Sequence, residues 1–202
     1  MNFEELPHLV ADLIAAHNFP AAEKLLLEAK SAAEREPDIR LVLSELIELY
    51  CVNNLFLKAE DLSIERERLA RSAYAKLQTA MILHHGAKDH LRAIPRLKAA
   101  ITQGKAERDD TTVYTALTLL GQSFLELGEI ENALSVLSEI ESMVASKAKI
   151  VIGDETCFLE MLRSKGFEVA RLERLSAILW KACRDPEFKR RLAKLAGGTL
   201  KT

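Results

Sequence analysis

The chain has 202 residues, of which 49% are hydrophobic and 29% are charged, and its formal net charge is -2. This composition excludes a disordered chain, and the length allows a core to form without a metal ion or disulfides. The small net charge gives no general attraction to nucleic acid or to an anionic membrane. Glycine, proline and aromatic residues are sparse, whereas alanine, leucine and glutamate are abundant, so the composition predicts helices throughout and excludes an all-β domain.

The cysteines and the chain start bear on the cellular setting. Cys51, Cys157 and Cys183 are an odd number with wide spacing, which favours a reduced environment and buried structural thiols. The first residues lack the basic and apolar blocks of a signal peptide, and no apolar run reaches the roughly 18 residues of a membrane-spanning helix. We therefore expect a cytoplasmic protein without a membrane span.

Residues that commonly follow a helix end divide the chain at regular intervals. They are Asn18, Asn54, Gly86, Gly128 and Gly166. Their spacing of roughly 32 to 42 residues is typical of repeats built from two helices. The sequence therefore predicts one domain over 1–202, with helical hairpins at 3–35, 38–70, 71–103, 112–145 and 154–183 and a capping helix at 185–196.

Prolines and caps set several expected boundaries in the first hairpins. Pro20 suits the first turn of a helix, and Pro37 should end that helix, with Asp38 capping the next one. Residues 55–85 contain neither glycine nor proline, so they form either one long helix or two helices joined by a tight turn near 70–72. The turn is favoured, because an unbroken helix of about 30 residues would be unusual in a compact repeat protein.

The second half contains two expected connections. Pro95 should kink a helix or mark its start. Residues 102–111 are polar and predict a connection, and residues 146–154 predict a second, partly extended one.

The stretch 112–144 has the clearest pattern. Apolar residues recur at steps of three and four on both sides of Gly128, which predicts two amphipathic helices. The first stripe contains Val113, Leu117, Leu120, Phe124 and Leu127, and the second contains Ile130, Ala133, Leu137, Ile140 and Val144. Gly121 lies beside the first stripe, where a missing side chain lets another helix come close.

Within this stretch, Leu117-x2-Leu120-Gly121-x2-Phe124 followed by Ala133-x3-Leu137 resembles the tetratricopeptide repeat. The chain departs from that pattern in lacking the tryptophan and the closing proline. The resemblance implies an all-α, right-handed solenoid of about five antiparallel helix pairs with a C-terminal capping helix. It also implies a protein-binding module, in which the first helix of each hairpin lines a concave groove.

The groove positions carried over from this resemblance have a mixed, partly aliphatic character. They are Ser44, Glu48, Gln78, Ile82, Thr115, Thr118, Gln122, Leu125, Glu155 and Leu159. None is Lys, Arg or Asn, so we do not expect the clamp with which some family members hold the C-terminal carboxylate of a chaperone. An amphipathic helix, or an extended segment offering Lys or Arg to Glu48 and Glu155, suits these positions better. The alternative is that these residues pack against the next repeat.

Other functions have weaker support in the sequence. No nucleotide-binding, metalloprotease or hydrolase motif is present, so we expect no enzyme and no cofactor. His84 and His85 are adjacent on a helix and point about 100° apart, so with His90 they do not predict a metal site. The basic residues at 184–194 are interpreted as a solvated face rather than a nucleic-acid site. A sensor for a small molecule or signalling peptide, and a self-assembly unit with an end repeat as the homo-oligomer contact, remain open.

Overall fold

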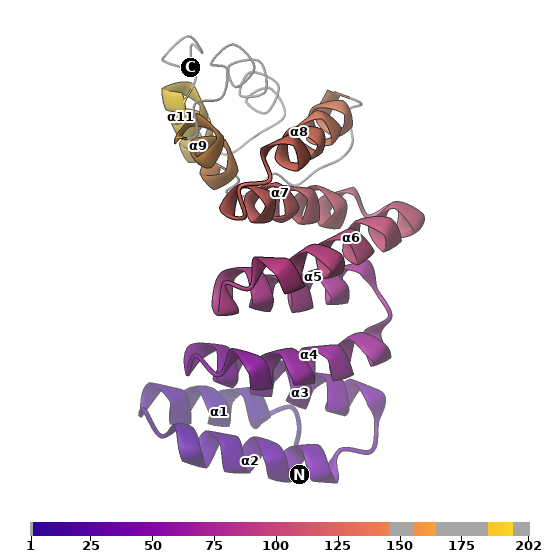
Figure 1. The fold of residues 1–202 in the computed structure, drawn as a ribbon. Coiled ribbons are helices and arrows are strands. Elements are labelled where there is room, and N and C mark those ends of the chain that lie inside the picture. The colour runs from indigo at the N-terminus through magenta and orange to yellow at the C-terminus, as the bar shows by residue number, and fades with distance from the viewer. Residues whose placement is uncertain (1, 146–155, 165–185, 196–202) are drawn as a thin grey trace. The chain divides into compact units, whose positions relative to one another are not determined.

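The computed structural model describes residues 2–145, 156–164 and 186–195, and every regular element in these ranges is a helix (Figure 1). The all-α class predicted from composition is therefore confirmed for the described part of the chain. Within those ranges no helix is both long and apolar enough to cross a membrane. The chain divides into two compact units, Met1–Asp89 (unit 1) and His90–Thr202 (unit 2).

Unit 1 is a series of helices in which each contacts the next. These are α1 (Leu6–Ala15), α2 (Phe19–Ala32), α3 (Glu36–Val52), α4 (Phe56–Ala70), α5 (Ala73–Met81) and the π-helix η1 (Ile82–Ala87). Its core takes apolar side chains from α1 to α4 and from η1, with Leu26, Leu46 and Ala59 fully buried among them. Small residues such as Ala59 let the helices approach closely, and Ser63 of α4 forms a buried hydrogen bond with Thr79 of α5 (2.9 Å).

The helix boundaries in unit 1 confirm the predicted place of Pro20 and correct the predictions for Pro37 and Asp38. Pro20 lies in the first turn of α2, as predicted. Asn18 caps the start of α2 by accepting a hydrogen bond from the Ala21 amide, and His17, not Asn18, takes the left-handed conformation after α1 (φ 55°). Pro37 does not end α2, which stops at Ala32, but lies in the first turn of α3. The prediction that Asp38 caps α3 is also wrong, because α3 begins at Glu36. Asp38 instead accepts hydrogen bonds from the Arg35 guanidinium at 2.7 and 3.1 Å.

The predicted turn between α4 and α5 is confirmed, and residues 55–85 do not form one long helix. Arg71 adopts the left-handed conformation (φ 47°), and the Ser72 side chain caps α5 by accepting a hydrogen bond from the Ala75 amide. A non-glycine residue takes this conformation only at an energetic cost. Because the left-handed residue is an arginine and not a glycine, no glycine in the sequence marked this turn.

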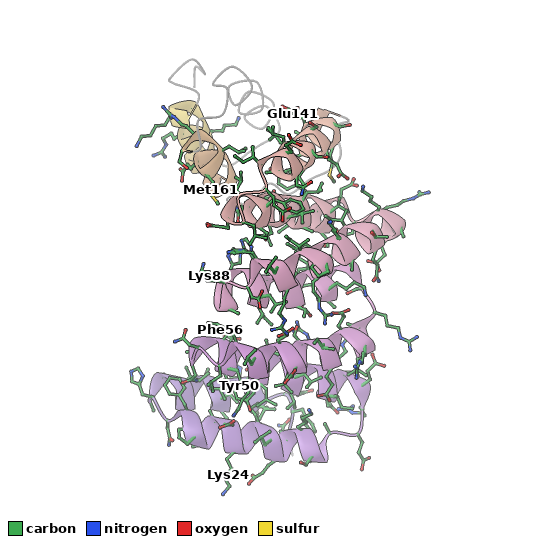
Figure 2. The ribbon with its side chains drawn as sticks, in the orientation of Figure 1. Lys24, Tyr50, Phe56, Lys88, Glu141 and Met161 are labelled. Atoms are coloured by element: carbon green, nitrogen blue, oxygen red, sulfur yellow. The ribbon has the colours of Figure 1, made fainter. Side chains whose placement is uncertain are left out.

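Gly86 lies inside η1 and does not end the helix, contrary to the sequence prediction. The helix continues to Ala87, and Lys88 adopts the left-handed conformation after it (φ 55°). A β-carbon at Gly86 would lie 2.5 and 2.6 Å from two ring carbons of Phe56 on α4. The glycine therefore allows η1 to approach the Phe56 ring, which Figure 2 labels.

We expect Gly86→Ala to destabilise the protein by about 1 kcal/mol, because the cost of displacing the Phe56 ring exceeds the gain in helix propensity. Urea denaturation would measure the change in the free energy of unfolding. In a Phe56→Leu background the same substitution should cost less, since the ring it collides with is gone. Equal costs in both backgrounds would contradict the close approach.

Unit 2 is built around its second helix. The described elements are α6 (His90–Glu107), α7 (Asp110–Glu126), α8 (Ile130–Ala145), α9 (Thr156–Ser164) and α11 (Pro186–Leu195). Helix α7 contacts α6, α8 and α9, and α9 contacts α11. From Thr112 to Leu125 every residue of α7 is buried except Thr115, as expected of a helix that is covered on all sides.

The boundaries of unit 2 correct one prediction and decide between the alternatives of another. Residues 102–107 belong to α6, so the predicted connection shrinks to Arg108, which is left-handed, and Asp109, which caps α7. Most residues in 102–107 are compatible with a helix, and their polarity reflects exposure rather than a loop. Pro95 lies inside α6, which begins at His90, so the alternative that Pro95 marks the start of the helix is excluded. The predicted connection at 146–154 lies outside the described residues.

The predicted hairpin at 112–145 matches α7 and α8 closely. Gly128 takes the left-handed conformation between them (φ 75°), as its spacing predicted. Most residues of both predicted stripes are buried, but Leu127 and Ile130, which flank the turn, are exposed. The buried part of the first stripe therefore ends at Phe124, and that of the second begins at Ala133.

Candidate functional site: a surface shared by α3, α4 and α5

Three of the four predicted groove positions on α7 are buried. Thr118, Gln122 and Leu125 are only 3%, 7% and 0% exposed, and Thr115 is half-buried. The expectation that these residues face a partner is corrected for the three buried ones, because α6, α8 and α9 surround α7. The alternative interpretation, that they serve packing, describes them better.

Three further groove positions also contribute no described surface. Ile82 is 8% exposed and belongs to the core of unit 1. Leu159 lies on α9, but the structure does not describe its side chain. Glu155 lies outside the described residues.

The remaining groove positions are accessible, and two of them meet at one side chain. Ser44 on α3 and Gln78 on α5 are half-buried, and Glu48 on α3 is exposed. The Arg66 guanidinium on α4 donates from Nη1 to Ser44 Oγ at 3.1 Å and from Nη2 to Gln78 Oε1 at 2.8 Å. Residues predicted from separate hairpins are thus joined by one side chain.

We call this region the Arg66 surface. It consists of Arg40, Ser44 and Glu48 on α3, Arg66 on α4, and Tyr74 and Gln78 on α5. Tyr74 contributes an aromatic ring that is 56% exposed. Ser44 donates its own hydroxyl hydrogen to the Arg40 carbonyl at 2.9 Å, which leaves its oxygen to accept from Arg66.

The electrostatic environment of Arg66 is unusual for a half-buried cation. Burial lowers the pKa of its guanidinium, the nearby Tyr74 hydroxyl acts in the opposite direction, and the positive charge of Arg40 lowers the pKa further. No carboxylate of the described residues lies within ion-pair distance of Arg66. The charge is therefore held by neutral hydrogen-bond acceptors.

An acidic edge borders this surface on α3. Glu48 lies one helical turn beyond Ser44, and Glu45 is half-buried beside it. Burial, followed by the charge of Glu48, raises the pKa of Glu45. The same two causes raise the pKa of the half-buried Cys51 thiol, which makes it less reactive as a nucleophile.

Sequence reasoning missed Arg66 because it lies in the alternating run Glu65-Arg66-Glu67-Arg68, which reads as a solvated face. The spacing of residues along α4 gave a weak indication that Arg66 lies near α5. Ala59, Ser63 and Arg66 follow steps of four and three, so Arg66 continues the α4 face on which Ser63 is buried against α5.

A second polar cluster fixes the position of α3 within unit 1. The Tyr50 hydroxyl donates to Glu23 Oε1 at 2.8 Å, and the Lys58 ammonium donates to the same oxygen at 3.1 Å. Lys58 also lies 4.9 Å from the centre of the Tyr50 ring. The cluster thereby joins α2, α3 and α4, and Tyr50 is labelled in Figure 2.

This cluster predicts a measurable alkaline transition. Burial, then the hydrogen bond to Glu23 and its charge, raise the pKa of Tyr50 to about 12. The folded protein favours the neutral phenol of Tyr50, so this phenol stabilises the folded state fully below the ordinary tyrosine pKa of about 10. This contribution to stability is lost as the pH rises from there to about 12. The ultraviolet absorbance of phenolate, compared between wild type and Tyr50→Phe, should reveal one phenol ionising near the upper value. A difference curve centred near pH 10 would contradict this assignment.

The chemistry available at the Arg66 surface is recognition by charge, hydrogen bonds and one aromatic ring. Among the residues that the structure describes, no group of three or more His, Cys, Asp and Glu side chains is placed to hold a metal ion.

No protein-family model matches the chain, and no curated protein matches it either.

Proposed function

We propose that this chain is a tetratricopeptide-like, right-handed helical-repeat protein that works in the cytoplasm as a protein-interaction module. In this proposal a segment of the partner protein lies on the Arg66 surface of unit 1, and no catalytic residue or cofactor takes part. The observation that carries the proposal is the meeting of Ser44 and Gln78, two positions expected in the groove, at one half-buried arginine. Helices α3 and α5 are also the first helices of the second and third expected hairpins.

Photo-crosslinking tests this proposal. A benzophenone amino acid in place of Glu48, which is exposed on α3, should form a discrete adduct with a protein in a lysate of the natural host. The matched control carries the same group in place of Glu131, which is exposed on α8. Identical adducts from both positions, or none from Glu48, would count against the proposed binding surface.

A self-assembly unit is the second candidate, and exposed apolar side chains favour it. Val52, Leu55 and Leu57, around the α3–α4 turn, are 53%, 43% and 67% exposed. Light scattering at two protein concentrations separates the candidates. A mass that rises with concentration in wild type and returns to that of a monomer in Leu57→Glu would favour self-assembly.

A further inference from the structure

Arg66 differs from the neighbouring cations of unit 1 in its partners. Lys30 pairs with Glu65 at 2.6 Å, and Lys76 pairs with Glu67 at 3.2 Å. The two acids that flank Arg66 along α4 are therefore engaged by lysines on α2 and α5. Within the described residues, Arg66 itself donates hydrogen bonds to the neutral oxygens of Ser44 and Gln78 and to no carboxylate.

Such an arrangement is unfavourable in the unbound protein. A cation that has lost part of its hydration needs an opposite charge to recover the full cost, and neutral acceptors recover only part of it. A guanidinium has five N–H donors in a fixed fork, so two hydrogen bonds leave donors for a further acceptor. The Ser44 and Gln78 contacts hold the fork in place without neutralising its charge.

We propose that Arg66 binds a carboxylate of the partner segment, an inference that rests on the proposed function. Arg40 supplies a second positive charge close enough to act on Arg66, and the exposed Tyr74 ring offers an apolar contact beside it. Carboxylates pair with guanidinium groups through parallel, charge-assisted hydrogen bonds, which are stronger than neutral ones. Binding therefore supplies the opposite charge that the unbound surface lacks.

The acidic edge narrows the chemistry of the partner. Glu48 lies one turn from Ser44 on α3, and a helical turn is about 5.4 Å long. Alternate residues of an extended segment lie about 6.6 to 7 Å apart on the same side. A segment with an acidic residue and a basic residue two positions away would satisfy Arg66 and Glu48 together. The carboxylates of Glu45 and Glu48 would repel a nucleic acid, whose phosphates form a continuous line of negative charge.

Selection of random displayed peptides on the full-length chain tests this inference. We expect enriched sequences with Asp or Glu and with Lys or Arg two positions away. For an enriched peptide, Arg66→Gln should weaken binding by about tenfold or more, because a charge-assisted pair is lost. Arg68→Gln is the matched control, since it removes the same charge from an exposed position on the same helix and should leave the affinity unchanged.

Two further arms keep the test independent of the fold of the variant. Replacing the acidic residue of the peptide by its amide should weaken binding to the wild-type protein to the same degree. Inorganic phosphate and a single-stranded oligonucleotide are titrated in parallel. Binding of either that depends on Arg66, without an acid-containing peptide, would overturn the choice of partner.

The outcomes separate this inference from the proposed function. Enriched peptides that lack acids and bind Arg66→Gln as well as wild type would overturn the role of Arg66 but leave peptide binding intact. A selection that enriches no peptide would count against both.

Discussion

Leu125→Glu is expected to unfold unit 2 rather than to alter a binding surface. Leu125 is fully buried on α7, between helices that cover it on all sides. A carboxylate there would lose its hydration without gaining a counterion, or would have to be protonated, and such changes cost more than about 4 kcal/mol. Urea denaturation followed by circular dichroism would show early loss of a large part of the helical signal.

The matched control for this variant is Leu91→Glu. Leu91 lies on α6 in the same unit and is 68% exposed, so the same chemical change should alter stability by less than about 0.5 kcal/mol. A Leu125→Glu protein as stable as the Leu91→Glu protein would mean that this face of α7 is open, as the original groove expectation required.

Gly121→Leu should destabilise unit 2 by about 1–3 kcal/mol. Gly121 is buried within α7, so four added carbon atoms have to be accommodated by displacing neighbouring helices. The midpoint of thermal unfolding would report the effect.

Gly121→Ala separates the effect of added side-chain volume from the effect of helix propensity. Alanine improves helix propensity and adds one carbon, so its cost should be clearly smaller than that of leucine. If the leucine variant melts at the wild-type temperature, no helix approaches α7 closely at this position.

The helices themselves were predictable because apolar periodicity depends only on local sequence. The α7–α8 hairpin follows from its stripes and from Gly128, the glycine that takes the left-handed conformation between them. Other helix ends were not predictable in the same way. His17, Arg71, Lys88 and Arg108 take that conformation without being glycine or asparagine, because the surrounding structure imposes it.

The candidate site was only partly predictable for a related reason. Periodicity tells which face of a helix is apolar, but it does not tell how many neighbours will cover the helix. Gln122 and Thr118 are polar residues on a helix that is covered on all sides, so their polarity suggested a surface that does not exist. Arg66 was overlooked because acids flank it in sequence, and only the folded chain shows that those acids pair elsewhere.

The combination of an unneutralised arginine and a nearby acidic edge gives unit 1 a directional charge pattern. A partner segment that matches it would be favoured in one orientation along α3, and a reversed segment would place like charges together. Charge patterns of this kind contribute more to specificity than to affinity. Because dissolved salt screens interactions between charges, we expect binding by this surface to weaken as salt concentration rises.

The most direct test of partner binding by unit 1 is a map of backbone amide chemical shifts in the full chain, with and without a peptide recovered by selection. The account predicts that the largest changes fall on α3 and α5 around Ser44, Glu48 and Gln78, and that the buried residues of α7 stay unchanged. Changes centred on α7 and α8, with none on α3 and α5, would contradict it.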